Sequence, residues 1–121
     1  MKYDATSRIE SVVLPGVYFI VRKMSLGGRI ELTRRIRDLA SQAEFLSAGC
    51  SPKEKLDAAL LTAEIERNYV LWGLADVGGL ELDGAAATVQ SLISHGPEDL
   101  LREALEAIKS ECGLSEKERK N

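Results

Sequence analysis

Hydrophobic and polar positions near the N-terminus follow a pattern that is typical of a β-hairpin. A dense apolar run surrounds Pro15-Gly16, a dipeptide that marks a tight turn. Residues 9–14 and 17–21 on its two sides are rich in Val and Ile, which favour strands. We therefore predict a hairpin over residues 9–22. Alternate residues of its second strand share one face, and both faces are apolar, so we expect helices to cover them.

The next pattern has a helical period. Ser25 is a suitable N-cap, so we predict a helix over residues 26–48. Gly27 and Gly28 weaken its first turn, and the regular part is expected to begin near Arg29. Apolar residues recur at alternating steps of four and three, which predicts one arm of a helical hairpin. This apolar seam consists of Leu32, Ile36, Leu39, Ala43 and Leu46.

A second helix is predicted from Pro52 to Trp72. Ser51 and Glu54 form a capping box around Pro52 at the first helical position. This helix carries two apolar faces, whereas a surface helix needs only one. Leu56, Ala59, Leu60, Ala63 and Val70 lie along the first face, and Ala58, Leu61, Ile65, Tyr69 and Trp72 lie along the second. A helix of this kind is covered on two sides, either within its own domain or by another chain.

Beyond Trp72 the elements become shorter. Gly73, Gly78 and Gly79 are expected to break the helix, and Asp83-Gly84 predicts a small hairpin over residues 80–87. Thr88 can cap a short helix to about residue 94. Pro97 opens a last helix that ends at Gly113. Its predicted buried stripe is Leu101, Ala104, Leu105, Ile108 and Cys112.

These elements predict a mainly α fold with a small β component. An N-terminal β-hairpin packs on a helical hairpin, followed by a short β-turn segment and two C-terminal helices. The chain has 121 residues and few aromatic side chains, which suits one domain with an aliphatic helical core. We expect one globular domain over residues 1–113 and a polar, disordered tail over 114–121.

Charge is unevenly distributed along the chain. Six bases and two acids between Arg22 and Asp38 give this segment a net charge of +4, within a chain whose net charge is −3. Such asymmetry indicates nucleic acid, an acidic protein or head-to-tail self-association as a partner, or a solvated helix face. Arg29, Arg34 and Arg37 form the candidate basic patch on the first helix. The nearby aromatic residues, Tyr18 and Phe19, lie in an apolar strand that needs them for packing, so an acidic protein surface is favoured over nucleic acid.

Residues that could perform chemistry are few. His95 is the sole histidine and lies where a short helix ends, a position that the helix dipole explains. Cys50 and Cys112 match no metal or redox spacing. The carboxylate pairs lie on helices dense in charge and are expected to face solvent. The sequence therefore predicts a protein that is not an enzyme, with no catalytic residues, no cofactor and no metal site.

The order of these motifs resembles small proteins of phage tail-morphogenesis modules, the phage tail assembly chaperone family. The resemblance rests on residues 13–25 with the Arg-rich helix, Trp72-Gly73-Leu74, residues 79–84, residues 97–108 and residues 113–121. One departure is Ala85-Ala86-Ala87, where the family pattern has a polar or charged residue after the turn. It puts the second arm of the small hairpin in question.

The resemblance implies a non-enzymatic helical protein in the cytoplasm of the bacterial host. It would bind the tape measure protein during virion morphogenesis and leave when the tail tube protein polymerises. Homo-oligomers are also expected, while nucleic acid and membranes are not expected partners. The candidate partner-binding residues are Leu61, Ile65, Tyr69 and Trp72, since Trp and Tyr are common interface anchors; the alternative is that Trp72 is core. Another function left open is a small phage-encoded regulator that binds nucleic acid or inhibits a host protein.

Overall fold

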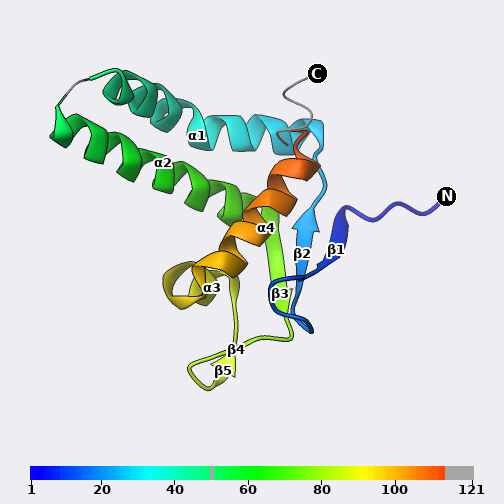
Figure 1. The fold of residues 1–121 in the computed structure, drawn as a ribbon. Helices are drawn as coiled ribbons and strands as arrows, with labels where there is room; N and C mark the ends of the chain where they lie inside the picture. Colours follow the sequence, from blue (N-terminus) through cyan, green and yellow to red (C-terminus); the bar gives the residue numbers. More distant parts are fainter. Residues whose placement is uncertain (50, 114–121) are drawn as a thin grey trace. The chain divides into compact units, whose positions relative to one another are not determined.

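The computed structural model describes residues 1–49 and 51–113. It is mostly helical with a small β component, as predicted (Figure 1). The elements in chain order are β1 (Thr6–Glu10), β2 (Tyr18–Arg22), α1 (Leu26–Ser47), α2 (Pro52–Gly73), β3 (Leu74–Gly78), β4 (Glu81–Leu82), β5 (Ala85–Ala86), α3 (Val89–His95) and α4 (Glu98–Glu111). The predicted tail at 114–121 lies outside the described residues.

Contacts divide the chain into two compact units. Unit 1 consists of Met1–Met24 and Tyr69–Asn121, and unit 2 consists of Ser25–Asn68. Unit 1 holds both sheets, α3 and α4, while unit 2 holds α1 and most of α2. The single domain over residues 1–113 stays a prediction.

The main sheet of unit 1 has the antiparallel order β1–β2–β3. Ile9 of β1 lies opposite Phe19 of β2, and Phe19 lies opposite Val77 of β3. The register shifts between Ile20 and Val21, so that Ala75 is an extra residue in β3. Strand β3 was not predicted, because this short segment between glycines was interpreted only as a helix break.

The first strand of the predicted hairpin begins and ends earlier than expected. It stops at Glu10, and residues 11–17 form the connection instead of continuing the strand to Leu14. Two backbone hydrogen bonds close this connection, from the Ser11 amide to the Val17 carbonyl at 2.8 Å and from the Val17 amide to the Leu14 carbonyl at 3.1 Å. Gly16 has φ +98°, which a residue with a side chain rarely adopts.

The core of unit 1 forms between this sheet and α4. Helix α4 contacts β2, and α3 contacts β3 and β4 (Figure 1). Phe19 and Val21, which share one face of β2 as predicted, are fully buried. Tyr18 and Ile20 on the other face are half-buried. At the end of α2 the backbone approaches α4 closely. A Cβ at Gly73 would lie 2.4 Å from Ile108 Cγ2, so only glycine fits this contact without movement.

The segment from Leu80 to the end of α4 follows the sequence prediction closely. Asp83 and Gly84 have φ values of 52° and 82°, as a type I′ turn requires, so the small hairpin forms despite its alanines. Thr88 caps α3 with a reciprocal bond to Ser91. The buried stripe of α4 differs at one position. Leu100 is fully buried and Leu101 half-buried, because Leu100 lies four residues before buried Ala104 on the same side.

Unit 2 is a helical hairpin in which α1 and α2 run side by side (Figure 1). The Ser25 hydroxyl accepts a hydrogen bond from the Gly28 amide at 3.0 Å, so α1 begins at Leu26 despite its two glycines. The Ser51 hydroxyl accepts one from the Glu54 amide at 3.1 Å, which confirms the predicted start of α2. The predicted seam of α1 is covered: Leu32 and Ala43 are buried, and its other members are half-buried.

Candidate interaction surfaces

The two apolar faces of α2 have different surroundings. The face with Ala58, Leu61 and Ile65 is buried or half-buried. On the opposite face Leu56 and Leu60 are 72% and 63% exposed. Ala59 and Ala63, between and after them, are also exposed. The open apolar surface of α2 is therefore part of the first of its two predicted apolar faces, and we call it the α2 stripe: Leu56, Ala59, Leu60 and Ala63. Val70, the fifth residue of that face, is buried.

The four candidate partner-binding residues lie on the covered face. Leu61 and Ile65 are half-buried in unit 2, and Tyr69 and Trp72 are buried where α2 enters unit 1. Trp72 is 2% exposed, and its indole Nε1 has no hydrogen-bond acceptor among the described residues. Their binding role stays a prediction, and it would require Tyr69 and Trp72 to become accessible.

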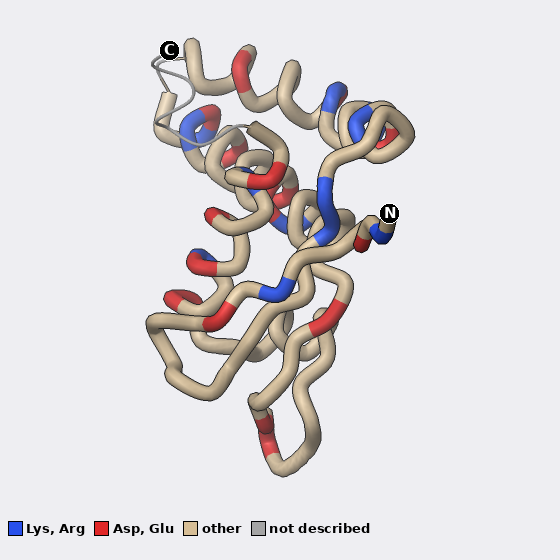
Figure 2. The backbone as a smooth tube through the Cα atoms, turned by 90° about the vertical axis from the view of Figure 1, so that its right-hand side faces the viewer, with Lys and Arg blue, Asp and Glu red and all other residues tan. Residues whose placement is uncertain are grey.

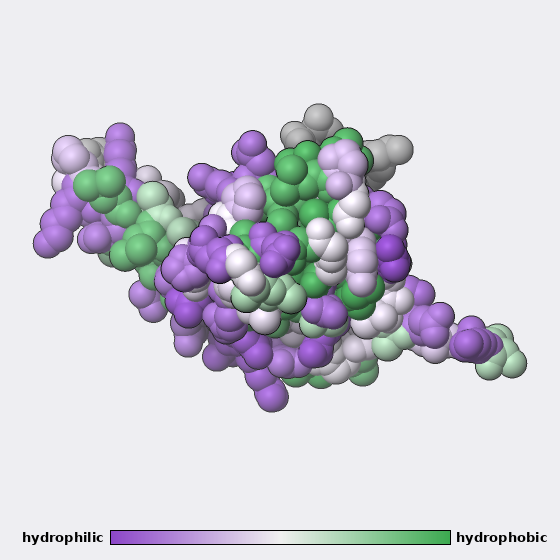
Figure 3. All heavy atoms as spheres, turned by 90° about the horizontal axis from the view of Figure 1, so that it is seen from below, coloured by the Kyte–Doolittle hydropathy of each residue, from purple (hydrophilic) through white to green (hydrophobic). Residues whose placement is uncertain are grey.

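Exposed apolar side chains also occur on α1. Leu26, Ile30 and Phe45 are 78%, 46% and 78% exposed. At 100° per residue, residues 26, 30, 34, 37 and 45 fall on one side of the helix, opposite the buried seam. We call this surface the α1 outer face: Leu26, Ile30, Arg34, Arg37 and Phe45. Figure 3 views the molecule from below, which is the α2 side in Figure 1, so the hydrophobic side chains that it shows on the helical hairpin are on that side and not on the α1 outer face.

The basic patch lies partly on this same face. Arg29, Arg34 and Arg37 are all exposed, and both basic and acidic positions occur along the helices (Figure 2). Arg37 lies 3.5 Å from the Asp38 carboxylate, and Arg35 lies 3.4 Å from Glu31. Exposed pairs of this kind stabilise little, and a partner can displace them. The two arginines of the α1 outer face thus lie between Ile30 and Phe45.

A surface hollow lies beside Phe45 at the C-terminal end of α1. It is lined by Ser41, Gln42, Phe45 and Leu46. Sequence reasoning did not select Phe45, because the seam of α1 accounted for the apolar period. Phe45 could have been selected from the sequence, because it is an aromatic residue that does not fall on the apolar seam of the helix.

The loop between β1 and β2 forms a further surface, although its residues 12–14 were predicted to continue the first strand. Val12 is 85% exposed and Val13 is 45% exposed. Glu103 on α4 binds this loop through its carboxylate. Its carboxylate accepts hydrogen bonds from the Ser11 hydroxyl and from the amides of Val12 at 2.7 Å and Val13 at 3.3 Å.

These bonds affect the ionisation of Glu103. Burial acts to raise the pKa of its carboxyl, but the hydrogen bond from Ser11 and those from the two amides stabilise the anion. The balance holds the pKa of Glu103 below its usual value of 4.5. The Ser11 hydroxyl also accepts the Leu14 amide at 3.0 Å, so one buried serine joins the carboxylate to the turn. The hydrogen bonds of Ser11 and Glu103 therefore stabilise the conformation of the β1–β2 loop.

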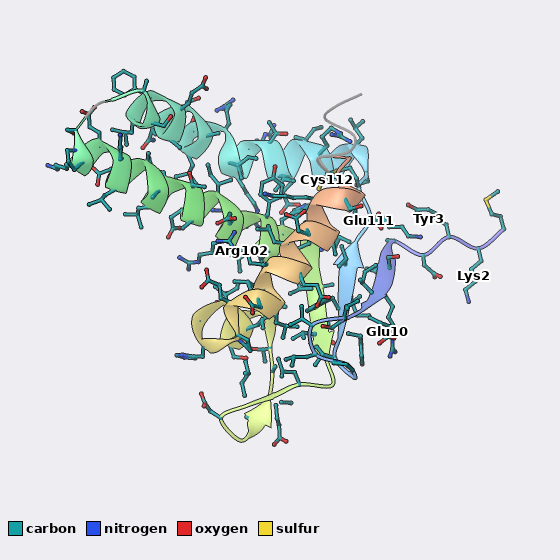
Figure 4. All side chains as sticks on the ribbon, in the orientation of Figure 1. Lys2, Tyr3, Glu10, Arg102, Glu111 and Cys112 are labelled. Atoms are coloured by element: carbon teal, nitrogen blue, oxygen red, sulfur yellow. The ribbon has the colours of Figure 1, made fainter. Side chains whose placement is uncertain are left out.

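The remaining chemically notable residues are dispersed. His95 is exposed at the last position of α3. Cys112 is buried just after the end of α4 beside Glu111, as labelled in Figure 4, while Cys50 lies outside the described residues. Over residues 1–49 and 51–113, His, Cys, Asp and Glu form no group of three that could hold a metal ion.

In the described part of the chain no helix combines the length and hydropathy that crossing a bilayer requires. Comparison with known proteins gave no match to a family model, to a curated protein or to a solved structure.

Proposed function

We propose that this protein is a non-enzymatic tail assembly chaperone that binds a helix of the tape measure protein in the cytoplasm of the bacterial host. The resemblance of its motif order to that family suggests the client. The observation that carries the proposal is the α1 outer face, where exposed Ile30 and Phe45 flank Arg34 and Arg37.

The chemistry of this face fits one class of client. A client helix would place an apolar stripe on Ile30 and Phe45 and carboxylates beside the two arginines. Full burial of a large apolar side chain contributes about 2 kcal/mol, so a few such contacts give a weak and reversible complex. Weak binding suits a chaperone that must release its client when the tail tube forms.

The test uses the full chain and a labelled acidic amphipathic helical peptide, with a scrambled peptide of the same composition as control. We expect binding to the first peptide alone, with an affinity that falls moderately as salt rises. The double variant Ile30→Ser/Phe45→Ser should lose this binding. The matched variant Leu56→Ser/Leu60→Ser, on the other helix of the hairpin, should keep it.

The exposed arginines also allow the second candidate function, a regulator that binds nucleic acid. Binding of duplex DNA through phosphate contacts would fall steeply with salt and would be insensitive to Ile30→Ser/Phe45→Ser. If the full chain shifts duplex DNA at physiological salt and ignores the amphipathic peptide, the regulator is the better account.

A further inference from the structure

The α2 stripe forms a second open surface of unit 2, on the opposite helix of the hairpin from the α1 outer face. Leu56 and Leu60 are exposed there, and the covered side of α2 lies half a turn away with Ala58 and Ile65. We propose that the occupant of this stripe is the α2 stripe of a second copy of this chain, packed antiparallel. This inference does not rest on the proposed function.

The order of large and small side chains is self-complementary in that orientation. Consider a two-fold axis that passes α2 between Ala59 and Leu60. It places Leu56 of one copy at the height of Ala63 of the other, and Leu60 at the height of Ala59. Leu56 then faces Ala63, while the two copies of Leu60 meet on one side of the axis and the two copies of Ala59 meet on the other, so the leucines leave water.

The charges beside the stripe favour the same orientation. Lys53 and Lys55 flank its N-terminal end, and Glu64 and Glu66 flank its C-terminal end. An antiparallel copy brings the lysines of one chain to the glutamates of the other, on both sides of the stripe. A parallel copy would set lysine against lysine and glutamate against glutamate, which is unfavourable.

Glu64 has a partner within its own chain, since Arg67 lies 3.6 Å from its carboxylate. Both side chains are about half exposed, 51% for Arg67 and 42% for Glu64, so this pair is hydrated. An exposed pair of this kind contributes little to stability and can rearrange when a lysine of another copy approaches.

The size of the contact sets the expected strength. The segment from Lys53 to Arg67 is roughly 22 Å long at the rise of an α-helix. One pair of such helices buries less than the roughly 1,000 Å² expected of a stable specific interface. The dimer should therefore be weak and dependent on concentration, a property that suits reversible assembly.

Charge reversal tests the proposal in the full chain. The mass of the wild-type protein in solution, measured by sedimentation over a wide concentration range, should rise from monomer to dimer. Lys53→Glu/Lys55→Glu and Glu64→Lys/Glu66→Lys should each stay monomeric, because each variant sets glutamate against glutamate or lysine against lysine across the two-fold axis. An equimolar mixture of the two variants should dimerise again. A wild type that stays monomeric, or single variants that associate as well as the wild type, would overturn the proposal.

Disulfide cross-linking tests the orientation. In a Cys50→Ser background, Ala59→Cys should form a covalent dimer under mild oxidation, because position 59 lies beside the two-fold axis. Ala63→Cys should not, because the two copies of position 63 are about seven residues apart along the helices, or roughly 10 Å. Equal cross-linking of both variants would indicate a parallel pair and contradict the proposal. Far-ultraviolet circular dichroism checks that every variant retains its helices.

Discussion

The Glu103 carboxylate on α4 accepts a hydrogen bond from the Ser11 hydroxyl, and the two residues are 92 positions apart in the chain. The same carboxylate binds the amides of Val12 and Val13. One side chain therefore fixes the β1–β2 loop against the C-terminal helix of unit 1. Long-range bonds of this kind order a segment that local backbone preference leaves free.

Replacement of Glu103 should destabilise the protein, since three donors of the loop lose their acceptor. We expect Glu103→Ala to lower the free energy of unfolding by about 1–3 kcal/mol, measured by urea denaturation. Glu106→Ala is the matched control, because Glu106 is exposed on the same helix; it should change stability by less than about 0.5 kcal/mol. Equal effects of the two variants would show that the loop contacts contribute nothing.

The stabilising effect of Glu103 should depend on pH. The pKa of its carboxyl is lower in the folded protein than its usual value of 4.5, so the folded state favours the anion. This stability is complete above the unfolded pKa and is lost as the pH falls through the folded pKa. The urea midpoints of the wild type and Glu103→Gln should therefore differ at neutral pH and converge in acid. A difference that stays constant down to strong acid would contradict this linkage.

Two glycines should respond oppositely to alanine. Gly73→Ala places a Cβ 2.4 Å from Ile108 Cγ2, and we expect it to cost about 1–3 kcal/mol of stability through overpacking. In the double variant Gly73→Ala/Ile108→Ala the loss of stability should be smaller than the sum of the two single losses, because removal of Ile108 Cγ2 also removes the clash. Thermal unfolding of both single variants and the double variant measures this coupling.

Gly27→Ala is the matched helical control. Gly27 lies in the first turn of α1, and a Cβ there meets nothing within 4 Å. Alanine has a higher helix propensity than glycine, so this variant should stabilise the protein by about 0.5–1 kcal/mol. A loss of stability would show that the first turn of α1 needs the freedom of glycine.

The turn of the small hairpin gives another conformational test. Asp83 has φ 52°, a region that Asn tolerates and a β-branched residue does not. Asp83→Val should destabilise the protein by about 1–2 kcal/mol, while Asp83→Asn should be close to neutral. Urea denaturation compares the two, and similar values would show that the turn relaxes without cost.

Local signals predicted much of this fold. The start of α2 was predicted from Ser51, Pro52 and Glu54, and the turn between β4 and β5 was predicted from Asp83-Gly84. Both predictions were possible because caps and turns depend on neighbouring residues. Strand β3 was missed, since its pairing with β2 depends on residues more than fifty positions away. The spacing of apolar residues also identified both apolar faces of α2, but it could not show which face is covered. That depends on tertiary packing, which is why the predicted binding residues Tyr69 and Trp72 are buried while Leu56 and Leu60 are open.

The most direct test of the account is an NMR titration of the full chain with the acidic amphipathic peptide. At 13.2 kDa the protein suits residue-by-residue assignment of its amide signals. The account predicts shifts that gather on α1 around Ile30, Arg34 and Phe45, with the α4 amides unchanged. Shifts confined to α4 and the β1–β2 loop, or no shifts at all, would contradict binding by the α1 outer face.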